Sequence, residues 1–271
     1  MKFKKTTMLC LVCFLLSLVI PTLVFSQQKA AQPQPGQAQV KETGKRVHPR
    51  EEYAPDQRPE ENYLARFKAI QVSEDLIRDN VENIYILKVI VSNFKEQGWE
   101  KEYNDIYEAY KKAVAKFYRR QVIYSRLELE KNKKQINELF KKIVAVYQNQ
   151  TYNMLDECAD KILNFSLDEK NKFDPNRSRT LFQNMMRLWI AYGQTDDSEA
   201  SIIDSQYKTG VYHLRIAKAY AIQILEELSA DPAAVSSQYK VHKADNLNRV
   251  LSPETAKSTT PGPSTSPATT R

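Results

Sequence analysis

The chain is predicted to be all-α: an elongated helical bundle with one or more very long helices, bent or V-shaped, between disordered termini. The 76 residues from Trp99 to Asp174 contain neither glycine nor proline, the two residues that most often interrupt a helix. Apolar residues recur at helical spacing along most of the chain. The one strand-like run, residues 84–91 (IYILKVIV), keeps a seven-residue phase that continues on both sides.

Residues 1–26 are predicted to be a secretory signal peptide, with three lysines before an apolar run and a small residue at Ser26. The alternative is a membrane anchor, but the run from Met8 to Phe25 contains Pro21 and is marginal for spanning. A cleaved signal predicts an exported protein with no stable membrane insertion. Only Cys158 then remains of three cysteines, so no internal disulfide can form, and a bacterial periplasm is the expected location.

Two segments are predicted to be disordered. Residues 27–58 form a lead rich in glutamine and proline, and residues 231–271 form a tail that becomes rich in serine, threonine and proline. Within the tail, residues 239–251 have a pattern that allows a short helix. Two interpretations of that segment stay open, a spacer and a docking peptide that folds on a partner.

The helical body is expected over residues 59–230. Its first helix is predicted to begin at Pro59, because proline is favoured at the first helical position. Apolar side chains at seven-residue intervals give this helix one buried face, and Gly98 is the expected C-terminal cap. The residues at this spacing are Tyr63, Ile70, Ile77, Ile84 and Val91.

A second helix is predicted from Trp99 to Asn164, which would make it roughly 100 Å long. Its apolar repeat lapses over residues 128–135 (ELEKNKKQ) and resumes at Ile136. A lapse inside a long helix indicates a change of phase or an unsupported bridge. We therefore expect a change of packing partners at this point, with a bare stretch of helix between two packed regions.

The last part of the body is predicted to begin at Asp174-Pro175, a capping residue followed by a first-turn proline. A short helix should end at Gly193, with Asp196 or Asp197 capping the next. Gly210 is expected to mark a close approach of helices. Asp231-Pro232 should stop the last helix, since proline is a poor helix interior residue.

The sequence offers little for catalysis. It lacks a glycine-rich phosphate loop and the GxSxG, HExxH and CxxC motifs. The three histidines, His48, His213 and His242, are scattered, and Cys158 lies at apolar helical spacing, as expected of a buried structural thiol. The prediction is a protein that is not an enzyme and that uses no cofactor, metal or small-molecule substrate.

Charge indicates protein partners. The 26 basic and 26 acidic residues between Pro59 and Ser229 balance, which argues against nucleic-acid binding. Residues 111–142 nevertheless hold eleven basic and three acidic side chains, with aromatic residues among them. They form either a solvated helix face or a basic, aromatic surface for an acidic or polymeric partner. The candidate partner-binding residues are Arg119, Arg120, Tyr124, Lys131, Lys133 and Lys134.

This organisation resembles that of the spirochaete flagellar-coiling proteins: a signal, a Gln/Pro-rich lead, a tyrosine-rich helical body with one very long helix, and a Ser/Thr/Pro tail. The resemblance is architectural and spans roughly residues 1–230. It implies a non-catalytic component of the periplasmic flagellar filament sheath, which binds other filament proteins and helps set filament shape, and hence motility.

Two alternatives stay open. One is a periplasmic chaperone or helical-repeat adaptor, because Gly98-Trp99 followed by Tyr103, Tyr107 and Tyr110 is similar to a tetratricopeptide helix. No 34-residue period recurs, which counts against that family. The other is a cell-envelope hydrolase or carrier with an unrecognised site.

Overall fold

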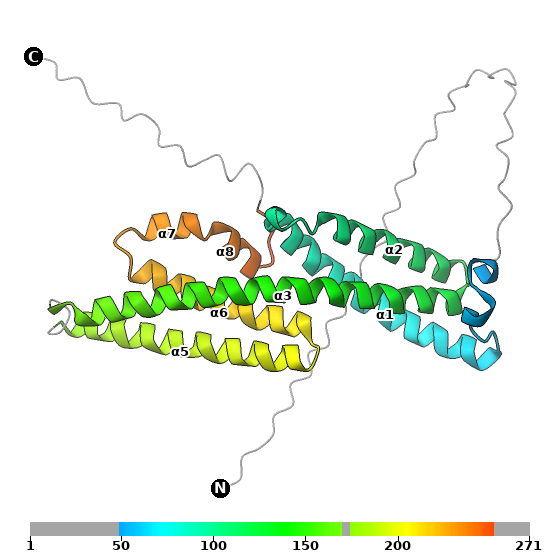
Figure 1. The fold of residues 1–271 in the computed structure, drawn as a ribbon, viewed down its shortest axis with the longest axis horizontal. Helices are drawn as coiled ribbons and strands as arrows, with labels where there is room; N and C mark the ends of the chain where they lie inside the picture. Colours follow the sequence, from blue (N-terminus) through cyan, green and yellow to red (C-terminus); the bar gives the residue numbers. More distant parts are fainter. Residues whose placement is uncertain (1–48, 170–173, 252–271) are drawn as a thin grey trace, which may run out of the picture. The chain divides into compact units, whose positions relative to one another are not determined.

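The computed structural model describes residues 49–169 and 174–251 (Figure 1). Within them lie seven α-helices, three short 3-10 helices and no strand, which confirms the all-α fold class. The predictions for residues 1–48 and 252–271 lie outside the described residues. The helices are α1 (Tyr63–Asn93), α2 (Glu100–Tyr118), α3 (Val122–Leu167), α5 (Pro175–Ile203), α6 (Tyr207–Glu227), α7 (Pro232–Gln238) and α8 (Lys240–Asn246), with 3-10 helices at Pro49–Glu52, Pro55–Gln57 and Lys95–Gln97.

Helix α3 organises the body. Its 46 residues make it about 70 Å long. Helices α1 and α2 pack on its N-terminal half, and α5 and α6 pack on its C-terminal half (Figure 1). The helical body is therefore elongated along α3. Two large cores follow this order, one centred on Phe140 and Tyr147 and the other on Leu155 and Cys158.

The predicted single helix from Trp99 to Asn164 is wrong, because a turn at residues 119–121 divides it into α2 and α3. Arg120 has φ 63°, in the left-handed region. The Arg120 amide donates to Phe117 O, and the Gln121 amide donates to Lys116 O. These two hydrogen bonds form a Schellman motif, which usually has glycine at the position of Arg120. The absence of glycine therefore hid a helix end.

The predicted helix end at Gly193 is also wrong. Helix α5 continues through Gly193 to Ile203, so Asp196 and Asp197 lie inside it and cap nothing. The turn that follows has Ser205 at φ 61°, again a non-glycine residue in the left-handed region. The Ser205 and Gln206 amides donate to Ile202 O and Ser201 O, which completes a second Schellman motif.

Helix starts follow the sequence more closely. Asp174 caps α5 by accepting a hydrogen bond from the Asn176 amide at 2.9 Å. Helix α6 ends at Glu227, before the predicted stop at Asp231-Pro232, and Asp231 instead caps α7. Helix α1 begins at Tyr63 instead of Pro59, because the Asn62 side chain accepts from the Ala65 amide at 2.7 Å.

Gly210 marks a close approach of α6 and α5, as predicted. A β-carbon there would lie 3.3 Å from Ile202 Cγ1 and 3.3 Å from Ser198 Oγ. Ser198 Oγ also donates to the Gly210 carbonyl at 3.1 Å. The α6 backbone therefore packs directly against side chains of α5 at this position.

The stretch 128–135 is not the predicted bare bridge. Leu129 and Asn132 are fully buried beneath α1 and α2. The Asn132 amide group donates to Ile106 O at 2.8 Å, and Asn80 donates to Leu129 O at 3.0 Å. Buried asparagines, Asn132 on α3 and Asn80 on α1, thus make the contacts that apolar residues make elsewhere along α3. The change of packing partners falls after Tyr147, where one large core gives way to the other.

The ordered body extends beyond both predicted limits. Tyr53, in the predicted disordered lead, is buried and packs on Tyr124 with ring centroids 5.2 Å apart. In the predicted disordered tail, Tyr239 and Asp245 are buried. The Asn93 side chain holds the end of this segment by donating to Arg249 O at 2.8 Å and accepting from the Leu251 amide at 2.9 Å.

Candidate protein-binding surfaces and a buried charge cluster

The described residues show neither a membrane span nor a metal cluster. No helix among residues 49–169 and 174–251 is both long and apolar enough to cross a bilayer. Over the same ranges, no three His, Cys, Asp or Glu side chains gather in a way that could hold a metal ion. Cys158 is buried as predicted and its Sγ donates to Ala221 O at 3.3 Å. Burial raises the pKa of the Cys158 thiol to about 12, so it is a poor nucleophile.

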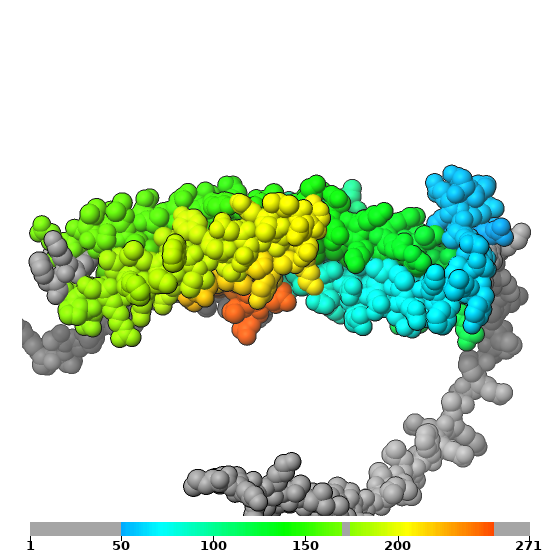
Figure 2. All heavy atoms as spheres, turned by 90° about the horizontal axis from the view of Figure 1, so that it is seen from below, coloured from blue at the N-terminus to red at the C-terminus, as the bar shows by residue number. Residues whose placement is uncertain are grey.

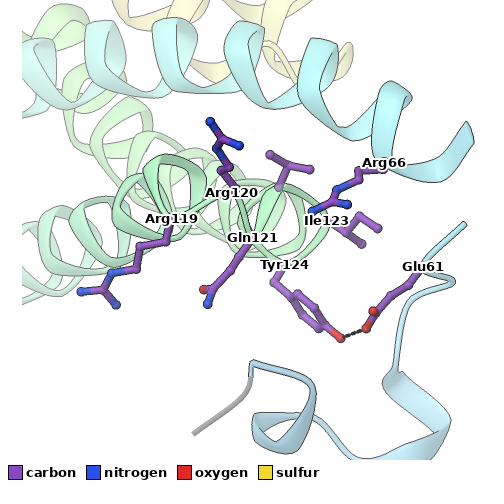
Figure 3. A pocket seen from close by; sticks show the side chains of 8 residues that line it. Glu61, Arg66, Arg119, Arg120, Gln121, Ile123 and Tyr124 are labelled. Atoms are coloured by element: carbon purple, nitrogen blue, oxygen red, sulfur yellow. Dashed lines mark hydrogen bonds between the residues drawn. The ribbon is translucent and has the colours of Figure 1, made fainter. Parts of the chain in front are cut away.

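The predicted basic surface lies mostly in solvent. Arg119, Arg120, Lys131, Lys133 and Lys134 are all exposed. Two arginines of this set line a pocket of about 300 Å³ at the α2–α3 turn, together with Arg66 of α1 (Figure 3). The other three lie further along α3.

The three lysines have different surroundings. Lys131 Nζ lies 5.3 Å from the centroid of the Tyr53 ring and 3.6 Å from Glu128 Oε1. Lys134 lines a different pocket, beside Glu102 and Glu138. The structure therefore spreads the six predicted residues along the α2–α3 turn and α3 and does not bring them together in one site.

Tyr124 does not belong to the exposed surface. Only 4% of it is accessible, and its hydroxyl donates to Glu61 Oε1 (Figure 3). Burial, together with that hydrogen bond, raises the pKa of Tyr124 to about 12. Its ring packs on Tyr53, so Tyr124 holds the segment before α1 onto α3 and is not available to a partner.

An apolar groove lies between the last turns of α3 and the first half of α5. We call it the α3/α5 groove. It encloses about 470 Å³ and its exposed surface is predominantly carbon. Trp189 at its edge is 76% exposed, which is high for a tryptophan. The lining residues are Ala159, Ile162, Leu163, Ser166, Met185, Leu188, Trp189 and Tyr192.

Further apolar side chains widen this exposed area. Leu167 is 71% exposed beyond the groove on α3, and Phe182 is 63% exposed on α5. Met186 and Ile190 add to the same helix face. A contiguous exposed apolar surface with an aromatic anchor is typical of a protein-binding site.

A second apolar face lies at the N-terminal end of α1, and we call it the α1 stripe. Its members share one side of the helix at spacings of one, three and four residues. The most exposed is Tyr63, at 85%. The α1 stripe consists of Tyr63, Leu64, Phe67 and Ile70. No described helix covers it.

A buried charge cluster joins α3, α6 and α8. Asp245 is fully buried and accepts three hydrogen bonds: from Tyr147 Oη at 2.7 Å, from Arg215 Nη2 at 2.6 Å and from Arg215 Nε at 3.1 Å. Charge-assisted, two-pronged contacts of this kind fix geometry strongly. They tie α8 to the middle of the body.

Lys218 lies beside this cluster and is fully enclosed. Its Nζ has no hydrogen-bond partner among the described residues and stands 3.3 Å from the centroid of the Tyr147 ring. Burial lowers the pKa of Lys218 to about 7, with Asp245 partly opposing that effect. Burial, followed by the Lys218 charge, lowers the pKa of His242 to about 4. The Lys218 side chain is fully buried.

Comparison with protein-family models, with curated proteins and with solved structures gave no match for this chain. Functional inference therefore rests on the geometry of these surfaces.

Sequence reasoning missed the groove because the apolar spacing of residues 181–192 predicted only a short amphipathic helix and did not say what covers its apolar face. The sequence feature that could have indicated an exposed groove is the number of large residues on that face, including two adjacent methionines and a tryptophan. It also missed Lys218, although this lysine follows Leu214 by four residues and precedes Ala221 by three, on the apolar side of α6.

Proposed function

We propose that this chain is an exported, non-catalytic structural protein that binds other proteins, and that it serves as a component of the periplasmic flagellar filament sheath. The α3/α5 groove carries the protein-binding part of this proposal. An apolar, aromatic surface of that size is costly to leave in water, and partner binding removes it from water.

The position of the groove supports an assembly role over a catalytic one. It is shallow and lined by carbon, and among the described residues no acid–base pair or nucleophile converges on it. Its walls are two long helices packed on a continuous core, so it is a rigid surface. The assignment to the filament sheath comes from the resemblance to flagellar-coiling proteins, and it is independent of the argument from the groove.

The test compares Trp189→Glu with Tyr212→Glu. Both place a charge at an exposed aromatic position, but Tyr212 is on α6 and outside the groove. In the organism that makes this chain, the wild type and Tyr212→Glu should co-purify with isolated periplasmic filaments, and Trp189→Glu should be lost from them at least tenfold. Deletion of the gene should change filament curvature and motility.

Two results would overturn the proposal. One is the absence of the wild-type chain from purified filaments. The other is salt-dependent binding of unfolded outer-membrane proteins that Trp189→Glu abolishes, because that behaviour belongs to a periplasmic chaperone.

A further inference from the structure

We propose that the α3/α5 groove of one copy receives the α1 stripe of a second copy of this chain, so that copies join head to tail. This inference rests on the proposed assembly function and names one partner of the groove. The chain itself presents both halves of such a contact: an apolar groove and an uncovered apolar helix face. A helix laid into a groove by residues at spacings of three and four is a common mode of recognition.

The charges around the two faces are complementary. The α3 wall of the groove runs from Ala159 to Ser166, and two acidic residues of α3 lie beside it. Asp156 and Asp160 are exposed within one or two turns of Leu163. Asp196, also exposed, follows Trp189 by two turns on α5. These three aspartates place acidic groups around the groove. On α5, Arg177 and Arg187 pair with Asp174 and Glu227, and Arg179 is exposed.

The α1 stripe has a basic neighbourhood. Arg66 is adjacent to Phe67 and lines the same pocket as Arg119 and Arg120 (Figure 3). Of the four basic residues in 116–126, Lys116 and Arg126 pair with Glu52 and Glu130, and Arg119 and Arg120 are exposed. Of the nearby acids, Glu61 already accepts the hydroxyl of Tyr124. Opposite rims of this kind favour encounter in one orientation.

One copy cannot make this contact with itself. The α1 stripe lies near the start of α3, where Glu61 bonds Tyr124. Leu163 in the groove is 39 residues further along the same uninterrupted helix, which corresponds to about 60 Å. Figure 2 shows α5 and α1 toward different ends of α3. The stripe that fills the groove must therefore come from another copy.

The chain segments outside the described residues fit the groove less well. Residues 252–271 contain no leucine, isoleucine, valine, methionine, phenylalanine or tryptophan, so they have nothing large to bury there. The run Met8–Phe25 is apolar, but it belongs to the expected signal peptide. Occupation of the groove by that run is therefore treated as an outcome of the test.

A contact between two different faces is head to tail, and it gives an open string unless the rotation between copies closes it into a ring. Each copy that joins leaves one free groove and one free α1 stripe, so the assembly grows by addition at both ends. The contact is small, and stability comes from repetition and from binding alongside other filament proteins.

The experiment uses the chain beginning at Gln27, which keeps all of the described residues, 49–169 and 174–251. Sedimentation velocity should show association of the wild type that increases with concentration. Trp189→Glu removes the groove, and Phe67→Glu removes the stripe. Each variant alone should stay monomeric, with self-association weakened at least tenfold. Tyr212→Glu should associate as the wild type does.

The deciding arm mixes the two variants. Trp189→Glu keeps its stripe and Phe67→Glu keeps its groove, so an equimolar mixture should form a one-to-one dimer that grows no further. Circular dichroism of each variant should match the wild type, which shows that both fold. A mixture that stays monomeric overturns the proposal, as does a wild type that never associates.

A final arm tests the competing occupant. Trp189 fluorescence is compared between monomeric Phe67→Glu with and without residues 1–26. Equal emission supports an open groove, and a red shift on removal of residues 1–26 overturns the proposal because that run then fills the groove. Loss of self-association with retained filament binding would contradict this contact alone and leave the proposed function standing.

Discussion

Lys218 shows how one residue can place a charge that depends on pH inside a helical core. It is enclosed by α6, by Tyr147 of α3, by Phe94 at the end of α1 and by the α8 residues Asp245 and His242. The nearest carboxylate, Asp245, already accepts hydrogen bonds from Arg215 and Tyr147. Lys218 is therefore held by ring contacts and by burial, which favour its neutral form.

This placement predicts a pH dependence of stability. The folded pKa of Lys218, about 7, lies below its unfolded value, so the unfolded chain binds more protons between these two values. Stability should rise with pH across that window, by about 2 kcal/mol from pH 7 to pH 9. Lys218→Met should be more stable than the wild type at pH 7 and should lose this rise. Guanidinium unfolding at the two pH values measures both effects.

The control is the exposed Lys88, where Lys88→Met should keep the wild-type difference between pH 7 and pH 9. An unchanged pH slope in Lys218→Met would contradict the argument. The prediction applies above pH 7, because below it the lysine is protonated in both states and contributes no further change.

At the scale of elements, a helix start with a capping side chain is easier to predict than a helix end, although α1 and α6 begin elsewhere than predicted. Asp174 and Asp231 carry a side chain that accepts from backbone amides, so the sequence names the cap. The ends at Arg120 and Ser205 depend on backbone conformation alone. An unbranched residue other than glycine or proline can be held in that conformation by the packing of the flanking helices, and the sequence then shows no sign of it.

The turn at Arg120 gives a stability prediction. Holding a residue other than glycine in the left-handed conformation destabilises the folded state by about 1–2 kcal/mol. Glycine removes this strain, but its greater freedom in the unfolded chain offsets part of the gain. Arg120→Gly should therefore stabilise the protein by about 1 kcal/mol, measured from urea unfolding midpoints. Arg119→Gly is the matched control: its φ of −81° is not strained, so it should destabilise by about 0.5–1 kcal/mol. Equal effects of the two substitutions would show that φ at position 120 is not strained.

At the scale of the whole body, the C-terminal helices belong to the fold. Helices α7 and α8 bring Tyr239 and Asp245 onto the two large cores, and Asn93 holds the residues after them. Low hydrophobicity alone predicted disorder for residues 231–271. The prediction failed over 231–251 because two aromatic or charged side chains with specific partners can hold a short, polar segment.

Two truncations test this conclusion. A chain that ends at Ala230 loses the Asp245 partner of Arg215 and Tyr147 and uncovers Phe94, so it should be destabilised by roughly 3 kcal/mol or more. A chain that ends at Leu251 keeps these contacts and should melt within error of the full chain. Thermal unfolding by circular dichroism measures both. Equal melting temperatures for the two truncations would mean that α7 and α8 contribute nothing.

The candidate surfaces also differ in how far the sequence predicts them. The exposed basic residues could be located from sequence because charge is rarely buried. The α3/α5 groove could not, because an apolar helix face has the same pattern whether a neighbouring helix or solvent covers it. Trp189 and Phe182 show this directly, since helical spacing places them on one face and only the packing of α5 leaves that face open.

The uninterrupted helix α3 also sets the distance between successive copies in a head-to-tail assembly. If one copy docks its first turns of α1 beside Leu163 of the next, the interval between successive copies is fixed by covalent geometry at about 6 nm, the rise of the 39 residues between Tyr124 and Leu163. Such strings should show axial striations near that spacing in electron micrographs, whatever surface they are laid upon.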